Sequence, residues 1–180
     1  MRITAGFYRH REIKMTNLKT TRETQDKVRM AIFNMLGQYF EGGNALDLFS
    51  GSGAMGIEAI SRGIAHADFN DLNKDAISIT KSNLDSLKIT DYEIYNLDYK
   101  EFYNKIHKQY DFIFLDPPYM MNNIEEILSL SLEHLSQKGK IIFEMDKESK
   151  YDVLSDKLEI LKDKTYGIKR VVVYCRRKND

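Results

Sequence analysis

The chain has 180 residues, 42% of them hydrophobic, and its 27 Lys or Arg balance 27 Asp or Glu. This length suits one domain with a sizeable core, and no apolar run reaches the roughly 18 residues that a membrane span needs. Because the single cysteine excludes an internal disulfide and the four histidines lack metal-ligand spacing, we expect a soluble, cytoplasmic protein with no metal and no membrane partner.

Charge is distributed unevenly along the chain. Residues 1–29 carry eight Lys or Arg against three Asp or Glu, and residues 162–180 carry seven against two, so the centre is acidic. Basic ends of this kind are compatible with a nucleic-acid footprint and equally with ordinary solvated surface charge.

The first part of the chain predicts a hairpin followed by a helix. Residues 1–20 read as an extended hairpin that turns near His10. A helix follows, because apolar residues recur at helical spacing: Val28, Ala31, Ile32, Met35 and Leu36. Thr24 is its candidate N-cap, Arg29 is expected on its exposed face, and residues 41–44 are expected to end it.

From residue 45 onward, strands and helices alternate, which predicts an α/β fold with a mostly parallel sheet and helices on both faces. The strands are expected at 45–49, 67–71, 92–96, 111–115 and 139–145. The helices are expected at 54–63, 73–87, 99–108, 123–136 and 149–157. Two more strands, at 158–161 and 168–175, are expected to pair through a turn at Gly167.

A glycine-rich turn follows the first strand. Gly51, Gly53 and Gly56 form a G-x-G-x-x-G pattern, which allows a ligand to approach the backbone. Asp71, at the end of the second strand, can hold ribose hydroxyls, so the two features predict an adenosine-containing ligand. Asp47, just before the glycines, would repel a pyrophosphate and attract the ammonium and sulfonium of S-adenosylmethionine.

The stretch Asp116-Pro-Pro-Tyr119 ends the fourth strand and carries the strongest chemical signal. Pro117 and Pro118 are the only prolines, and they stiffen the turn while removing competing N–H groups. Asp116 and the Pro117 carbonyl can accept both N–H groups of an exocyclic amine while the base stacks on Tyr119. The alternative is a loop that starts the next helix. Asp98, after the third strand, could likewise bind an adenine amino group or cap a helix.

These segments together resemble the class I S-adenosylmethionine-dependent methyltransferases that modify exocyclic amines. More narrowly, the whole chain resembles the bacterial RsmD family, which methylates a guanine N2 of 16S ribosomal RNA. The closer resemblance rests on residues 3–9, 21–29 and 164–167. It implies a seven-stranded, Rossmann-like sheet whose last strand is antiparallel, with an N-terminal β-hairpin extension over 1–20 and a catalytic domain over 21–180.

The resemblance also implies which residues form the site. The implied catalytic residues are Asp116, Pro117, Pro118 and Tyr119. The implied residues for S-adenosylmethionine are Asp47, Phe49, Gly51, Ser52, Gly53, Gly56, Asp71, Leu72 and Asp98. The residues expected to bind RNA are Arg9, Arg11, Arg22, Thr24 and Arg29, and the implied partner is 16S ribosomal RNA, the 30S subunit or its assembly intermediate. Glu23 departs from the family, which usually has proline there, and Asp71 stands where glutamate is usual.

Three other functions use some of the same features. A DNA adenine-N6 or cytosine-N4 methyltransferase would use the same acidic residues, but the chain has only about 40 residues before the catalytic fold in which to read DNA. An NAD-dependent oxidoreductase is disfavoured by Asp47 and by Asp116-Pro-Pro-Tyr119. A non-catalytic RNA-binding ribosome assembly factor could retain the same fold.

Overall fold

The computed structural model describes residues 1–16, 26–118, 121–149 and 156–178. The strands are β1 (Asn44–Asp47), β2 (His66–Asn70), β3 (Tyr92–Tyr95), β4 (Tyr110–Leu115), β5 (Leu135–Asp146), β6 (Leu158–Tyr166) and β7 (Lys169–Arg176). The helices are α1 (Asp26–Leu36), α2 (Ala54–Ser61), α3 (Lys74–Leu87), α4 (Tyr99–Lys105) and α5 (Ile124–Glu133). Within the described ranges, no helix has both the length and the apolar character needed to cross a membrane.

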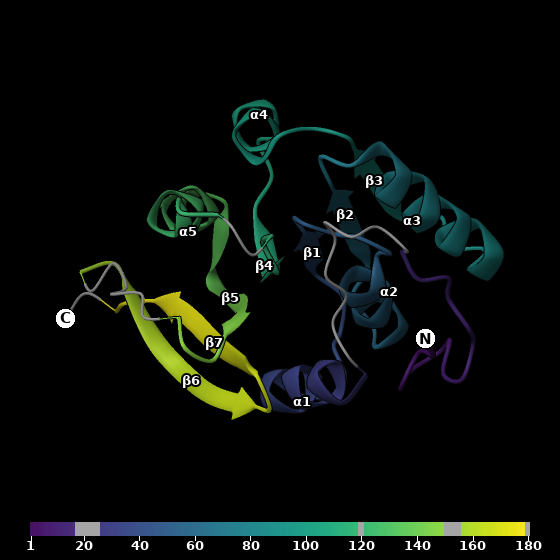
Figure 1. The fold of residues 1–180 in the computed structure, drawn as a ribbon, viewed down its shortest axis with the longest axis horizontal. Helices are drawn as coiled ribbons and strands as arrows, with labels where there is room; N and C mark the ends of the chain where they lie inside the picture. Colours follow the sequence, from purple (N-terminus) through teal and green to yellow (C-terminus); the bar gives the residue numbers. More distant parts are fainter. Residues whose placement is uncertain (17–25, 119–120, 150–155, 179–180) are drawn as a thin grey trace.

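The strands form one seven-stranded sheet in the order β3-β2-β1-β4-β5-β7-β6 (Figure 1). Strands β1 to β5 pair in parallel, whereas β7 lies antiparallel between β5 and β6. The predicted mostly parallel sheet with an antiparallel last strand is therefore confirmed. Because the chain reverses its direction of winding between β3 and β4, β1 and β4 flank the switch point where ligands of α/β sheets bind.

Helices cover both faces of the sheet, as the alternation of elements predicted. Apolar residues of α1, α2 and α3 form one buried cluster, and those of α4 and α5 form a second on the opposite face (Figure 1). Strand β4 contributes side chains to both clusters, because Phe114 faces the first while Ile113 and Leu115 face the second. Residues that follow β4 are thereby held by packing on two sides.

Several element boundaries differ from the sequence predictions. Helix α1 ends at Leu36 rather than at 41–44, because Gly37 adopts a left-handed φ of 108° and its N–H bonds back to the Phe33 carbonyl. Helix α5 ends at Glu133, and β5 begins soon afterwards, with an irregular register opposite Tyr110 and Phe112. The helix predicted over 149–157 falls mainly on residues outside the described ranges.

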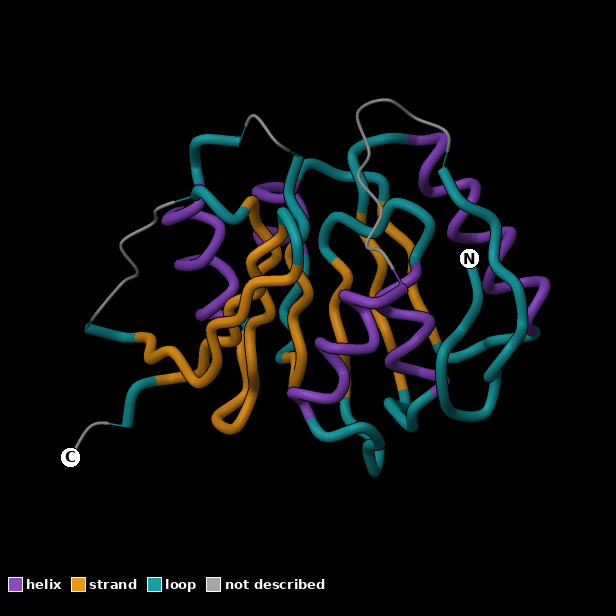
Figure 2. Tube along the Cα trace, turned by 60° about the horizontal axis from the view of Figure 1, so that its bottom comes forward, coloured by secondary structure: helices purple, strands orange, loops and turns teal. Residues whose placement is uncertain are grey.

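The predicted N-terminal hairpin is present as one antiparallel bridge between Arg2 and Glu12, flanked by backbone hydrogen bonds from the Ile3 N–H to the Arg11 carbonyl and from the Ile13 N–H to the Met1 carbonyl, both at 3.0 Å. Further along the segment, the Thr4 and Ala5 N–H groups bond to the Glu58 carboxylate of α2, at 3.0 and 3.1 Å. Ile3 is 2% exposed and belongs to the core cluster beneath α2. Figure 2 shows the segment as a loop that lies along the helical face. A boundary between residues 1–20 and the rest stays a prediction.

Candidate functional site

A cavity of about 350 Å³ opens at the carboxyl ends of the parallel strands. Loops after four strands line it, because their ends meet at the same edge of the sheet. Six of the site residues predicted from the sequence line it: Phe49, Asp71, Leu72, Asp98, Asp116 and Pro118. The structure therefore brings the expected ribose and adenine residues next to the expected catalytic aspartate.

The glycine turn joins β1 to α2, and its glycines have different roles. Gly53 takes a left-handed φ of 78° at the start of α2, a conformation that side chains disfavour. Gly56 has no such backbone requirement. A Cβ there would lie 2.3 Å from Cε1 of Phe69, so this glycine allows α2 to pack closely on β2. Its N–H donates to Oδ2 of Asp47 at 3.0 Å.

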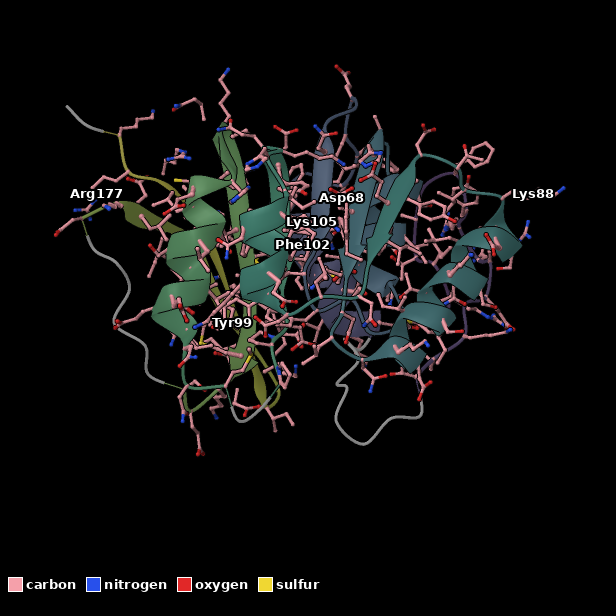
Figure 3. All side chains as sticks on the ribbon, turned by 90° about the horizontal axis from the view of Figure 1, so that it is seen from above. Asp68, Lys88, Tyr99, Phe102, Lys105 and Arg177 are labelled. Carbon is pink, nitrogen blue, oxygen red and sulfur yellow. The ribbon has the colours of Figure 1, made fainter. Side chains whose placement is uncertain are left out.

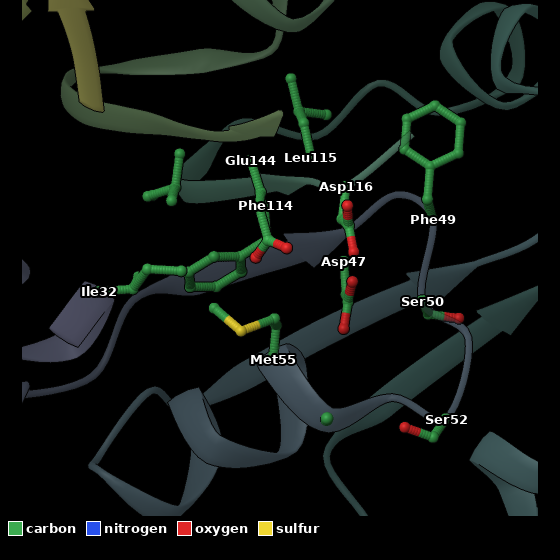
Figure 4. Close-up of a pocket in the computed structure, with 12 residues that line it drawn as sticks. Ile32, Asp47, Phe49, Ser50, Ser52, Met55, Phe114, Leu115, Asp116 and Glu144 are labelled. Atoms are coloured by element: carbon green, nitrogen blue, oxygen red, sulfur yellow. The ribbon is translucent and has the colours of Figure 1, made fainter. Parts of the chain in front are cut away.

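Asp47 lies at the base of a narrower pocket that it shares with Ser50, Ser52 and Asp116. The residue is 4% exposed, and its burial raises the pKa of the carboxyl to about 7, against the opposing effect of the Gly56 N–H. Ser50 Oγ lines the same pocket, is buried, and has no hydrogen-bond partner among the described residues. Figure 4 shows Asp47 and Asp116 at this pocket, with Ser50 and Ser52 on the loop that leads into α2. A buried acid and an orphaned hydroxyl are a fit for a cationic, polar ligand group.

Asp71 and Asp98 project from the loops after β2 and β3. Asp71 accepts the N–H groups of Gly51 at 2.9 Å and Asn73 at 2.8 Å, yet its burial raises the pKa of the carboxyl above its ordinary value. Asp98 accepts the Lys100 N–H at 2.9 Å as the N-cap of α4 and also lines the cavity. The two interpretations of Asp98 are therefore compatible.

Asp116 borders both pockets described above, and its neighbours include two residues that the sequence analysis did not single out. Its Oδ1 lies 3.4 Å from Nζ of Lys169, which also bonds to the carboxylate of Glu144. Glu144 offered a signal, because it is the one charge within the apolar run 141–145 and is 4% exposed in β5. The sequence contained no comparable signal for Lys169, since a lysine is common at the start of a strand.

The two prolines differ in the hydrogen bonds of their carbonyls. The Pro118 carbonyl accepts the Met121 N–H at 3.1 Å. The Pro117 carbonyl has no donor among the described residues, so it is the better acceptor for a target amine. Tyr119 lies outside the described residues, and its proposed stacking role stays a prediction.

Arg29 was expected on an exposed helix face, and this prediction is wrong. The residue is 0% exposed and its Nε donates to Oε2 of Glu58 at 3.2 Å. The helical spacing contained the reason, because Arg29 stands three and four residues before Ile32 and Phe33 and shares their buried stripe. Its guanidinium forms ion pairs with Glu58 and Asp26 within the fold. Arg22 and Thr24 lie outside the described residues.

Arg9 and Arg11 are exposed, but they lie far from the cavity. Together with Phe7 and Lys88 they border an open hollow at the C-terminal end of α3. Helix α3 starts beside the cavity and spans about 21 Å at the usual rise per residue. Arg177 follows β7, which is antiparallel, so it lies at this same far edge (Figure 3). Contact of Arg9 and Arg11 with RNA stays a prediction.

The described residues contain no group of three or more metal-ligating side chains placed around one point.

A family model described as "Conserved hypothetical protein 95" matches residues 1–175. The chain is 39% identical to "Putative rRNA methyltransferase YlbH" of Bacillus subtilis, over 98% of this chain and 100% of that protein. It is 34% identical to "Ribosomal RNA small subunit methyltransferase D" of Haemophilus influenzae, over 93% and 90%. The solved structure of yhhF from Escherichia coli superposes with a TM-score of 0.85 at 25% identity, over 98% of this chain and 97% of that one. The fold is the Rossmann-like class I methyltransferase fold.

Proposed function

Because the chain belongs to the RsmD family of methyltransferases, described as conserved hypothetical protein 95, we propose that it methylates guanine N2 in 16S ribosomal RNA with S-adenosylmethionine. The observation that carries this proposal is the cavity that joins Asp71 and Asp98 to Asp116. An adenosine site and an acceptor for an exocyclic amine then share one space. The Haemophilus influenzae relative is named for the small-subunit ribosomal RNA, which supports this substrate.

The residues of the site fit S-adenosylmethionine better than a dinucleotide. Asp71 would hold the ribose and Asp98 the adenine amino group, beside the apolar rings and chains of Phe49 and Leu72. Asp47 and the unpaired Ser50 hydroxyl would hold the amino-acid end. A pyrophosphate would place two negative charges against this acidic set, which is unfavourable at short range.

The chemical work left to the protein is to orient a weak nucleophile. When bound, S-adenosylmethionine would supply a methyl carbon already activated on a sulfonium, and transfer of that methyl to the nitrogen would return the electrons of the C–S bond to sulfur. Asp116 and the Pro117 carbonyl would accept the two N–H bonds of the base, which favours a pyramidal nitrogen with its lone pair exposed. The Asp116 carboxylate would then take the one proton that the methylated nitrogen loses.

The target base must leave its stack to reach Asp116, which costs a few kcal/mol in a duplex and less in a loop. A structured RNA with an accessible loop guanine therefore suits this site better than duplex DNA. In this proposal Tyr119 stacks on the base, and Arg9 and Arg11 contact RNA away from the target. The 30S subunit or its assembly intermediate would present the same loop.

The test is methyl transfer from isotopically labelled S-adenosylmethionine to free 16S RNA, to the 30S particle and to duplex DNA. Digestion to nucleosides and mass spectrometry would identify the product. The proposal predicts N2-methylguanosine from an RNA substrate, with most turnover lost in Asp116→Ala and cofactor affinity kept within a few-fold. Product in DNA alone would favour the adenine or cytosine methyltransferase. RNA binding without any transfer would favour the assembly factor.

A further inference from the structure

Two acidic side chains meet beside the proposed target site. The registered pair Leu115–Phe143 is the last one between β4 and β5, and Asp116 and Glu144 follow it on neighbouring strands. Both carboxylates therefore leave the sheet at the same level. The side chain of Asp116 is 14% exposed and that of Glu144 is 4% exposed, so water screens them poorly.

Lys169 supplies the positive charge between these two carboxylates. It is the first residue of β7 and pairs with Asp146 of β5, which places its side chain diagonally across from Glu144 on the same face. Its Nζ lies 3.4 Å from Oδ1 of Asp116 and bonds to Oε1 of Glu144. Although burial alone would lower it, the charges of Asp116 and Glu144 raise the pKa of the Lys169 ammonium above its ordinary value.

We propose that Lys169 is a positioning residue for methyl transfer, which keeps the Asp116 carboxylate ionised and oriented while Glu144 limits the strength of that effect. The inference rests on the proposed function of Asp116. A protonated Asp116 could not take the proton of the target amine, so the acid must be ionised at working pH. A lone ammonium would hold it ionised but would make it a poor base. Glu144 shares the ammonium and so preserves basicity.

Other charged side chains line the same pockets as Asp116, and the variants used to test the proposal must leave them unchanged. Asp47 of β1 shares the narrower pocket with it, and Asp71 and Asp98 line the larger cavity. Asp146 of β5 borders a third hollow together with Asp116 and Lys169. All of these are acids, so Lys169 is the only base among the residues that line the three hollows within the described part of the chain.

The experiment is a carbon-13 NMR titration of the aspartate carboxyls, with the Asp116 signal assigned by Asp116→Asn. Lys169→Met should raise the pKa of Asp116 by about 1–3 units, the usual effect of losing an adjacent cation. Glu144→Gln should lower it, and Lys169→Arg should keep it near the wild-type value. Lys162→Met, an exposed lysine on the neighbouring β6, is the matched control and should change nothing.

The pH profile of the single-turnover rate gives the functional readout. Its acid limb should move to higher pH in Lys169→Met and to lower pH in Glu144→Gln, while cofactor affinity stays within about twofold. Shifts of the same sign in both variants, or no shift of the carboxyl signal, would overturn the inference. Failure of the wild type to methylate RNA would refute the proposed function instead, and the carboxyl titration would still decide the coupling. Circular dichroism establishes that each variant is folded, and Glu144→Gln with Lys169→Arg keeps the test decisive if Lys169→Met unfolds.

Discussion

Glu58 of α2 binds two buried arginines, and its replacement by glutamine tests whether they are structural. Its carboxylate is 0% exposed and accepts from Nε of Arg29 at 3.2 Å and Nε of Arg62 at 2.8 Å. It also accepts the backbone N–H groups of Thr4 and Ala5. One carboxylate therefore bridges two guanidiniums and fixes the N-terminal segment against α2.

Glu58→Gln would keep the shape of the side chain and remove its charge. Arg62 would then have no carboxylate within ion-pair distance among the described residues, and Arg29 would keep only Asp26, which is half exposed. Removing one partner of a buried ion pair costs about 3–5 kcal/mol. For a chain of this size, each kcal/mol lowers the melting temperature by roughly 2–4 °C, so we expect a fall of about 6–20 °C.

Urea unfolding followed by circular dichroism measures this loss. Glu12→Gln is the matched control, because Glu12 pairs with Arg2 on the surface and its side chain is 72% exposed. That change should cost at most about 1 kcal/mol. A loss below about 1 kcal/mol for Glu58→Gln would refute the reasoning, since it would mean that the buried arginines do not depend on the carboxylate. Arg29→Met should likewise destabilise the fold, while RNA affinity of the folded fraction is unchanged.

Three further predictions concern the glycine turn and the cofactor cavity. Asp71→Ala should weaken the binding of S-adenosylmethionine, measured by calorimetry, by about 1–3 kcal/mol, which is the usual loss for a hydrogen bond involving a charged group. The pKa of Asp47 is raised to about 7 in the folded chain, so its ionised form grows as pH rises through 7, and affinity for a cationic cofactor should rise with it. Asp47→Asn should flatten that dependence. Because the folded chain binds the Asp47 proton more tightly than the unfolded chain does, the stability of the wild type should fall as pH rises from about 4 to 7, and Asp47→Asn should remove that fall. Gly56→Ala should cost about 1–3 kcal/mol in urea unfolding, because the added methyl would meet the Phe69 ring at 2.3 Å.

The order of the elements could be predicted because local patterns determine it. Apolar runs with β-branched and aromatic residues gave β1 to β5, and helical spacing gave the helices between them. The boundaries of the helices and strands were harder to predict, because they depend on tertiary contacts. The N-terminal segment shows this: its two arms pair as far as Ile3, and the next two residues, Thr4 and Ala5, donate to Glu58, more than 50 residues away.

The acids of the site could be predicted because each one ends or follows a strand of a parallel sheet, and such positions converge at one edge. Asp47, Asp71, Asp98 and Asp116 all come from this rule. Lys169 could not be found in this way, because it begins an antiparallel strand. The carboxyl edge of the parallel strands is where an antiparallel strand starts, so a search of this edge must include first residues as well as last ones.

The same geometric rule bears on how a large substrate is held. The basic residues near the two ends of the chain gave a charge pattern that was compatible with a nucleic-acid footprint and equally with solvated surface charge. Arg9, Arg11 and Arg177 lie at the edge where the parallel strands begin, about one length of α3 from the cavity. A free nucleotide bound beside Asp116 could not reach them. Only a polymer that extends beyond its target base could contact both edges at once, and its phosphates would then be bound far from the acidic cavity that repels them. If Arg9 and Arg11 contact the substrate, as proposed, the separation of charge within this small domain favours a structured RNA over a small-molecule amine as the methyl acceptor.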